Sequence, residues 1–133
     1  MTDTLKILEA QDAVSPVAAD LALVAASLDA LAAYEQAASS CAAAMSASGG
    51  MPDAVEAALT SVDVAVATRR VLTRSAGKAD LVRLQLGAAG ASCELSRSQC
   101  ASHVHHHEHC RLHVAAADEV ISTSTALSGS LSS

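Results

Sequence analysis

The segment from Cys93 to His113 concentrates the side chains of this chain that can bind a metal ion. It holds all six histidines and three of the four cysteines. Thiolate sulfur and imidazole nitrogen are ligands of soft and borderline metals. A polar, solvated helix junction is the alternative explanation, but it accounts poorly for so many histidines in step with cysteines. The segment therefore predicts a metal site.

The spacing of these residues fits the faces of two helices. Cys93 and Cys100 are seven residues apart, which places them two turns apart on one helix face, and His103 continues their line. Later pairs are three or four residues apart and can converge on one ion: His106 with Cys110, Cys110 with His113, and His109 with His113. A turn between the helices would gather residues 103–107 at one end of the protein. We therefore expect a mouth of imidazoles above a short column of thiols.

Two further sulfur atoms come from an earlier part of the chain. Cys41 and Met45 are four residues apart and can face the thiol column from across the core. A free cysteine on an apolar helix face is often a small buried hydrophobe, and a methionine is more often a core residue than a ligand. His105 has no partner on its face and is expected to be a solvated turn residue. The predicted metal ligands are Cys41, Met45, Cys93, Cys100, His103, His106, His107, His109, Cys110 and His113.

The donor types suit more than one metal and more than one function. Thiolate with imidazole and thioether suits Cu(I), whereas two cysteines with two histidines suit tetrahedral Zn²⁺; the sulfur-rich column and Met45 favour Cu(I). An enzyme is the alternative from another class, with a metal that keeps an open position or a haem on an axial histidine. Glu108 is the obvious carboxylate for acid–base chemistry, but the sequence offers no carboxylate pair or phosphate loop. A bundle that binds partners without metal is the third alternative.

The composition indicates an all-α protein of one domain, residues 1–133. Apolar residues make up 51% of the chain, chiefly Ala, Val and Leu, and Tyr34 is the single aromatic residue. Because aromatic and β-branched residues furnish most strands and large cores, a sheet protein is not expected. Ala-rich chains favour helices that pack closely through small residues.

Capping and breaking residues divide the chain into helices. Ser15 and Pro16 suit the N-cap and the first helical position, Pro52 begins another helix, and Gly77 interrupts the chain. We expect a short N-terminal helix or arm at 4–13, helices at about 16–48, 52–75, 78–104 and 107–127, and a disordered tail at 128–133. Short connections between four helices predict an antiparallel up-down-up-down bundle.

Small residues dominate the positions that the helical period turns inward. They are Ala38, Ser61, Ala65, Ala89, Ser96 and Ala117, and the last helix adds Cys110, His113, Val120 and Leu127 on the same face. Each buried methylene contributes only about 0.8 kcal/mol, so such a core stabilises weakly. We expect tight packing, formation of a homo-oligomer or a cross-linking ligand to add to the stability of the fold.

Charge and segment composition exclude several partners. The net charge of −6, without a basic run, argues against nucleic acid. Asp20 and Asp29 interrupt the apolar segment that would otherwise suggest a membrane span. The start of the chain carries no secretory signal, so we expect a cytoplasmic protein whose cysteines are reduced.

Three motifs resemble the bacterial copper storage proteins, which are four-helix bundles lined by cysteines. The segment His107-Glu-His-Cys110-Arg111, preceded by Cys100-x-x-His103, is similar to the turn between the family's third and fourth helices. Residues 63–74 are similar to its second helix, and Cys41-x-x-x-Met45 falls where the family has a Cys-x-x-x-Cys pair. The resemblance spans about residues 17–127. It implies Cu(I) as the metal and the histidine-bearing end as the opening where copper enters.

The chain departs from that family in its core. Positions that align with the family's cysteines hold Ala38, Met45, Ser61, Ala65, Ser96, His113, Ala117 and Val120. Only Cys41, Cys93, Cys100 and Cys110 remain. We therefore expect a cysteine-depleted relative that binds little copper and acts in buffering or transfer rather than in high-capacity storage.

Overall fold

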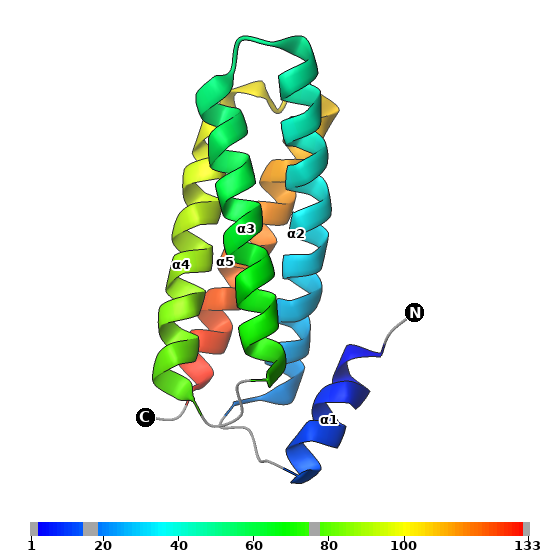
Figure 1. The fold of residues 1–133 in the computed structure, drawn as a ribbon, viewed down its shortest axis with the longest axis vertical. Coiled ribbons are helices and arrows are strands. Elements are labelled where there is room, and N and C mark those ends of the chain that lie inside the picture. The colour runs from blue at the N-terminus through cyan, green and yellow to red at the C-terminus, as the bar shows by residue number, and fades with distance from the viewer. Residues whose placement is uncertain (1–2, 15–18, 75–77, 132–133) are drawn as a thin grey trace.

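The computed structural model describes residues 3–14, 19–74 and 78–131, and all regular secondary structure in those ranges is helical. The helices are α1 (Thr4–Val14), α2 (Leu21–Ser48), α3 (Pro52–Arg74), α4 (Ala79–Cys100) and α5 (Glu108–Ser130), with a 3₁₀ turn, η1 (Ala101–His103), after α4. Helices α2 to α5 form a four-helix bundle, and α1 is the short additional helix (Figure 1). The predicted all-α class and the bundle are confirmed.

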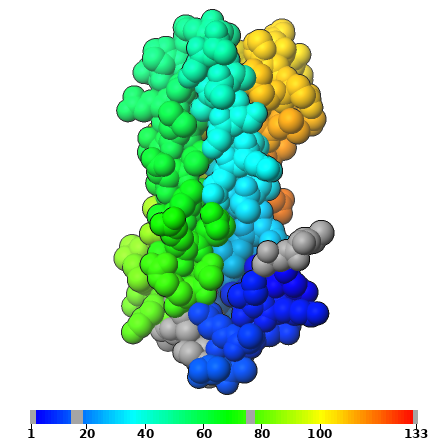
Figure 2. Space-filling model, turned by 45° about the vertical axis from the view of Figure 1, so that its right-hand side comes forward, coloured from blue at the N-terminus to red at the C-terminus, as the bar shows by residue number. Residues whose placement is uncertain are grey.

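The four long helices pack in a ring, in the order α2, α3, α4, α5 and back to α2. The α2–α3 turn and the α4–α5 connection lie at the same end of the bundle (Figure 1). Helix α1 packs against α2 near the other end, where Leu8 is buried and the Thr4 hydroxyl donates to the Asp29 carboxylate at 3.1 Å. The space-filling view shows α1 against the side of the bundle (Figure 2). The histidine-rich segment therefore occupies the end away from α1.

Helix α2 begins later than the sequence predicts. The Asp20 carboxylate accepts hydrogen bonds from the backbone N–H groups of Ala22 at 2.9 Å and Leu23 at 3.4 Å, and the Asp20 backbone is extended. This is N-cap geometry, because the carboxylate satisfies N–H groups that have no partner inside the helix. The predicted start at residue 16 is therefore wrong; Ser15 and Pro16 lie outside the described residues.

Replacing Asp20 by alanine is expected to lower the free energy of unfolding by about 1 kcal/mol, the usual cost of losing an N-cap. Urea denaturation followed by far-UV circular dichroism measures it. Asp63→Ala is the control, because Asp63 is exposed in the middle of α3 and its loss should change the free energy by less than about 0.5 kcal/mol. Equal effects of the two substitutions would contradict the capping role.

The other helix ends also differ from the prediction. Helix α4 ends at Cys100 rather than near residue 104, and α5 begins after His107. At its far end α5 continues to Ser130, so the expected disorder is wrong for residues 128–130. Leu127 is fully buried there, and Arg83 donates to the Leu131 carbonyl at 3.3 Å, which anchors the end of the helix against α4. The predicted break at residue 77 lies outside the described residues.

The core contains the small residues that the helical period turns inward. Ala38, Ser61, Ala65, Ala89, Ser96 and Ala117 are all at most 1% exposed, as predicted. Leucines and valines surround Tyr34 in one buried cluster. A second cluster of Ala42, Met45, Ala54 and Ala58 holds three of the cysteines. In the described part of the chain, no helix is both long and apolar enough to span a membrane.

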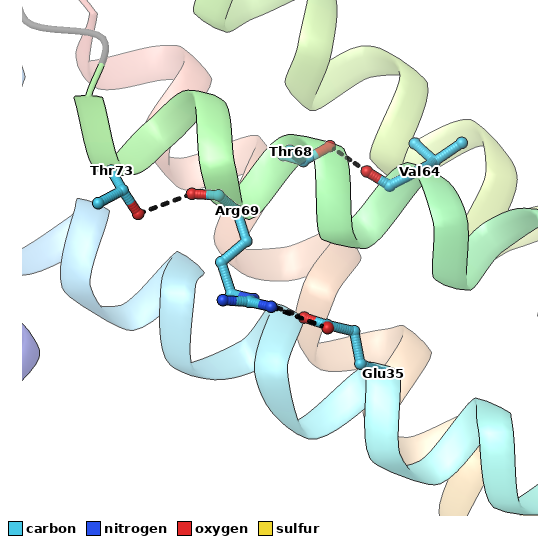
Figure 3. A network of polar contacts seen from close by, with 5 residues as sticks. All are labelled: Glu35, Val64, Thr68, Arg69 and Thr73. Carbon is cyan, nitrogen blue, oxygen red and sulfur yellow. Dashed lines mark hydrogen bonds and ion pairs between the residues drawn. The ribbon is translucent and has the colours of Figure 1, made fainter. Parts of the chain in front are cut away.

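A polar network holds α2 and α3 in register. Arg69 donates from Nε and Nη2 to the two oxygens of Glu35, at 2.6 and 3.0 Å (Figure 3). The hydroxyls of Thr68 and Thr73 donate to the carbonyls of Val64 and Arg69 within α3, at 2.7 and 2.8 Å. A bidentate pair of this kind fixes the relative orientation of two helices as well as attracting them. It thus helps to set where α2 side chains meet the rest of the core.

Candidate metal centre

Three cysteine sulfurs converge at the histidine-bearing end of the bundle. Cys41 comes from α2, Cys100 is the last residue of α4, and Cys110 lies in the first turn of α5. Their sulfur atoms all lie within 4.8 Å of one another, and all three side chains are fully buried. We call these residues the thiol trio. Because each cysteine lies on a different helix, it is the packing of these helices that brings the sulfurs together.

Two imidazoles adjoin the thiol trio. The His109 Nδ1 atom lies 3.2 Å from the Cys41 sulfur and 3.5 Å from the Cys110 sulfur. The His113 Nδ1 atom lies 3.5 Å from the Cys100 sulfur, and this ring is fully buried. Three thiols with one or two imidazoles make a donor set that suits Cu(I) or tetrahedral Zn²⁺. The residues present therefore fit a soft or borderline metal ion.

The three thiols of the trio differ in their pKa values. A hydrogen bond from the Cys41 thiol holds the pKa of Cys100 well below its usual value in spite of burial. The same hydrogen bond, together with burial, raises the pKa of Cys41. Burial and the negative charge on Cys100 raise the pKa of Cys110. Of the three thiols, Cys100 is therefore the one that loses its proton most readily.

Cys93 lies apart from the thiol trio among the described residues. It is seven residues before Cys100 on α4, about 10.5 Å along the helix axis, which is too far for both sulfurs to bind one ion. It packs in the leucine-rich cluster beside Tyr34, and burial raises its pKa to about 11. Met45, in contrast, is buried in the same cluster as the trio.

The remaining histidines lead from the trio to the surface. The ring centroids of His107 and His109 are 5.2 Å apart and stacked, and those of His103 and His107 are 6.2 Å apart. His107 is exposed, whereas His109 is partly buried and its Nδ1 atom contacts the Cys41 sulfur. The exposed His107 ring thus lies next to both His103 and His109, and His109 in turn contacts the thiol trio. His105 and His106 are exposed.

Glu108, the carboxylate considered for acid–base chemistry, pairs with Arg111. Its carboxylate is exposed and forms an ion pair with Arg111 one turn later, with Nε at 2.9 Å. This hydrogen bond lowers the pKa of Glu108. A carboxylate with a lowered pKa is a weaker base, which does not favour a role in proton abstraction.

Sequence reasoning missed the polar residues behind the site. His113 Nε2 lies 2.9 Å from the Ser96 hydroxyl and 3.2 Å from the Tyr34 hydroxyl, and Tyr34 lies 2.6 Å from the Ser61 hydroxyl. All four side chains are fully buried. The available signal was the polarity of Ser61 and Ser96 at inward positions, together with the single aromatic residue of the chain, because buried hydroxyls require partners.

Comparison with solved structures identifies the fold. The chain is similar to the copper storage protein Ccsp from Streptomyces lividans loaded with 10 copper equivalents, with a TM-score of 0.86 at 24% identity over 97% of this chain and 100% of that one. It is also similar to a histidine-to-alanine variant of Ccsp, with a TM-score of 0.79 at 25% identity over 86% and 99%.

A third solved structure gives the same result. A cytosolic copper storage protein from Streptomyces lividans holding five coppers matches with a TM-score of 0.77 at 26% identity, over 83% of this chain and 95% of that one. No family model and no curated protein matches this chain. In fold, this chain is a relative of the bacterial copper storage proteins.

Proposed function

We propose that this chain, as an antiparallel up-down-up-down bundle, binds Cu(I) at the histidine-bearing end and acts in copper buffering or transfer. The observation that carries the proposal is the convergence of the Cys41, Cys100 and Cys110 sulfurs within 4.8 Å. Copper-loaded proteins of the same fold support copper as the metal. Thiolate sulfur is the ligand that Cu(I) prefers, and a buried, water-poor site protects it from oxidation.

The thiol trio supplies the thiolates in this proposal, and His109 and His113 supply imidazoles. Met45 packs in the same cluster and provides a thioether as an additional, weaker ligand. Three histidines, His103, His106 and His107, form the mouth through which copper reaches the trio. Cys93 serves as a further thiol deeper in the bundle, separate from the first site.

A low capacity follows from the number of sulfurs. Copper stores need many thiolates, whereas this chain has four cysteines and only three of them converge. A site with one or a few ions, reached through exchangeable imidazoles, suits buffering or hand-over better than storage. Imidazoles bind Cu(I) more weakly than thiolates do, so they can pass the ion inward.

Zinc is the second candidate, favoured by one specific feature. Three thiols with His109 form a Cys₃His set, which is a common structural zinc site. In that case the ion would cross-link α2, α4 and α5 near their ends, and the chain would be a structural metalloprotein rather than a carrier.

We further propose a cytoplasmic protein that works without nucleic acid or membrane partners. A homo-oligomer is part of the same proposal, because α4 exposes Leu81, Leu84 and Leu95, at 52, 74 and 58%. Exposed leucines at helical spacing are typical of a face that another helix covers.

The deciding experiment is metal analysis of anaerobically purified, tag-free protein, followed by Cu(I) titration against a competing chelator. We expect one to a few Cu(I) per chain, bound more tightly than Zn²⁺. Stoichiometric zinc that Cu(I) does not displace would favour the structural zinc site. Haem iron, or a metal with exchangeable water, would favour an enzyme, and no metal at all would contradict the proposal.

A further inference from the structure

The buried histidine of the site has polar neighbours on two other helices, α2 and α4. On one side, His113 Nδ1 points to the Cys100 sulfur at 3.5 Å. On the other side, Nε2 meets Ser96 of α4 at 2.9 Å and Tyr34 of α2 at 3.2 Å. The Tyr34 and His113 rings meet edge to face, with centroids 5.5 Å apart. Since a neutral imidazole carries one proton, its position decides which nitrogen can bind a metal.

The direction of the hydrogen bonds can be assigned from a backbone carbonyl, which can only accept. The Ser61 hydroxyl donates to the Ala58 carbonyl at 2.7 Å, so its single proton is used. In the 2.6 Å contact between Tyr34 and Ser61, Tyr34 must then be the donor. The single Tyr34 proton is therefore also used. Its oxygen can meet His113 Nε2 only as an acceptor, which requires the proton to be on Nε2.

Ser96 does not impose this choice. Its hydroxyl can donate to a bare Nε2 or accept from a protonated Nε2, because no backbone group in the described part of the chain fixes its proton. Only the chain from Ala58 through Ser61 to Tyr34 has a fixed direction. With the proton on Nε2, the lone pair of Nδ1 points toward the thiol trio.

We propose that Tyr34 is a positioning residue of the metal site: it accepts the Nε2 proton of His113 and so keeps Nδ1 free to bind the metal beside Cys100. This rests on the proposed copper site for the identity of the metal. Histidine ligands generally donate their other ring N–H to a fixed acceptor, which sets the tautomer and orients the ring. Here the phenol oxygen of Tyr34 on the neighbouring helix α2, itself oriented by Ser61, performs that task.

The tautomer can be tested without any metal. In ¹⁵N-labelled, metal-free protein, two-bond ¹H–¹⁵N correlations identify the tautomer of His113 at a pH where its own titration shows the ring to be neutral. We expect protonated Nε2 and bare Nδ1. Tyr34→Phe removes the partner that holds the proton on Nε2, and Ser96 can then donate to Nε2 as well as accept from it, so the fraction of His113 with the proton on Nδ1 should rise. In Ser96→Ala, the Tyr34 acceptor remains and the tautomer should not change.

Cu(I) affinity provides the second test on the same two variants. Tyr34→Phe should weaken Cu(I) binding by about 10- to 100-fold, the usual effect of losing the partner of a histidine ligand, while Ser96→Ala should stay within about threefold of the wild type. In His113→Ala, the added Tyr34→Phe substitution should have no further effect. If the role of Tyr34 were purely structural, Tyr34→Phe and Ser96→Ala should lower the Cu(I) affinity by similar factors.

Several results would overturn the inference. They are a protonated Nδ1 or a mixed tautomer in the wild type, an unchanged tautomer in Tyr34→Phe, or equal affinities of Tyr34→Phe and wild type. If Tyr34→Phe does not fold, Ser61→Ala replaces it, because Tyr34 then becomes free to donate to Nε2 and the same change of tautomer is expected. Failure of the wild type to bind Cu(I) would contradict the proposed function, whereas the metal-free tautomer still decides the role of Tyr34.

Discussion

Replacing Cys100 by serine is expected to weaken Cu(I) binding by about two orders of magnitude, whereas Cys93→Ser should leave the affinity within about threefold. Cys100 has a lowered pKa, and its sulfur lies within 4.8 Å of the Cys41 sulfur and 3.5 Å from His113 Nδ1. Structural Zn²⁺ sites with four thiolate and imidazole ligands bind with about 10–16 kcal/mol, and on the same scale one ligand of a Cu(I) site accounts for about 3 kcal/mol. Since about 1.4 kcal/mol is a factor of ten, this gives about a hundredfold loss. A competing Cu(I) chelator under anaerobic conditions measures it.

Cys93→Ser is a matched control for the cost of a buried hydroxyl. Both cysteines are fully buried on the same face of α4, so each serine should lower the free energy of unfolding by a similar amount, measured by urea denaturation without metal. Only the Cys100 variant should lose copper affinity. An equal loss in both variants would mean that the trio is not the binding site, or that Cys93 shares it.

The apparent Cu(I) affinity is expected to rise about a hundredfold per pH unit near neutrality. Binding requires three thiolates. Because its pKa is lowered, Cys100 is expected to be ionised before the metal binds, so two protons must leave on binding. They leave Cys41 and Cys110, whose raised pKa values keep them protonated at neutral pH. Protons compete with the metal, so affinity increases with pH, by about two logarithmic units per pH unit, until these thiols ionise.

Titrations at four pH values between about 6.5 and 8, corrected for the protonation of the chelator, measure this slope. Three independent thiols near the ordinary pKa of about 8.5 would instead release nearly three protons. A slope near three would therefore contradict the shared proton of Cys41 and Cys100. Cys110→Ser removes one of the two protons, and its slope should fall to about one. A slope near zero in the wild type would exclude thiolate ligands.

Helical periodicity allowed the inward faces to be predicted from the sequence. Cys110, His113, Ala117, Val120 and Leu127 were expected on one face of the last helix, and all five are fully buried. The repeat of 3.6 residues is a property of the local backbone, so distant contacts do not alter it. The helix ends were harder to predict. Ser15 and Asp20 are both suitable N-caps, and only the folded chain shows that Asp20 caps α2.

Membership of the thiol trio depended on contacts between helices. Cys93 and Cys100 share a helix face, yet the rise of the helix separates them by about 10.5 Å. Cys41 was equally well explained as a buried hydrophobe, and it lies 59 residues before Cys100. Its proximity to Cys100 and Cys110 follows from the rotation and axial shift of α2 against α4 and α5. Those parameters arise from side-chain packing over the whole interface, which local patterns do not encode.

The sequence by itself determined the helical class, the inward faces and the concentration of metal-binding side chains near one turn, because each depends on residue type and local spacing. Only the tertiary structure decided which thiols meet and how His113 is oriented. Its orientation depends on Ser61 and Tyr34, which stand 52 and 79 residues away from it. Hydrogen bonds act over about 3 Å, so a shift of one helix by a single turn would remove them.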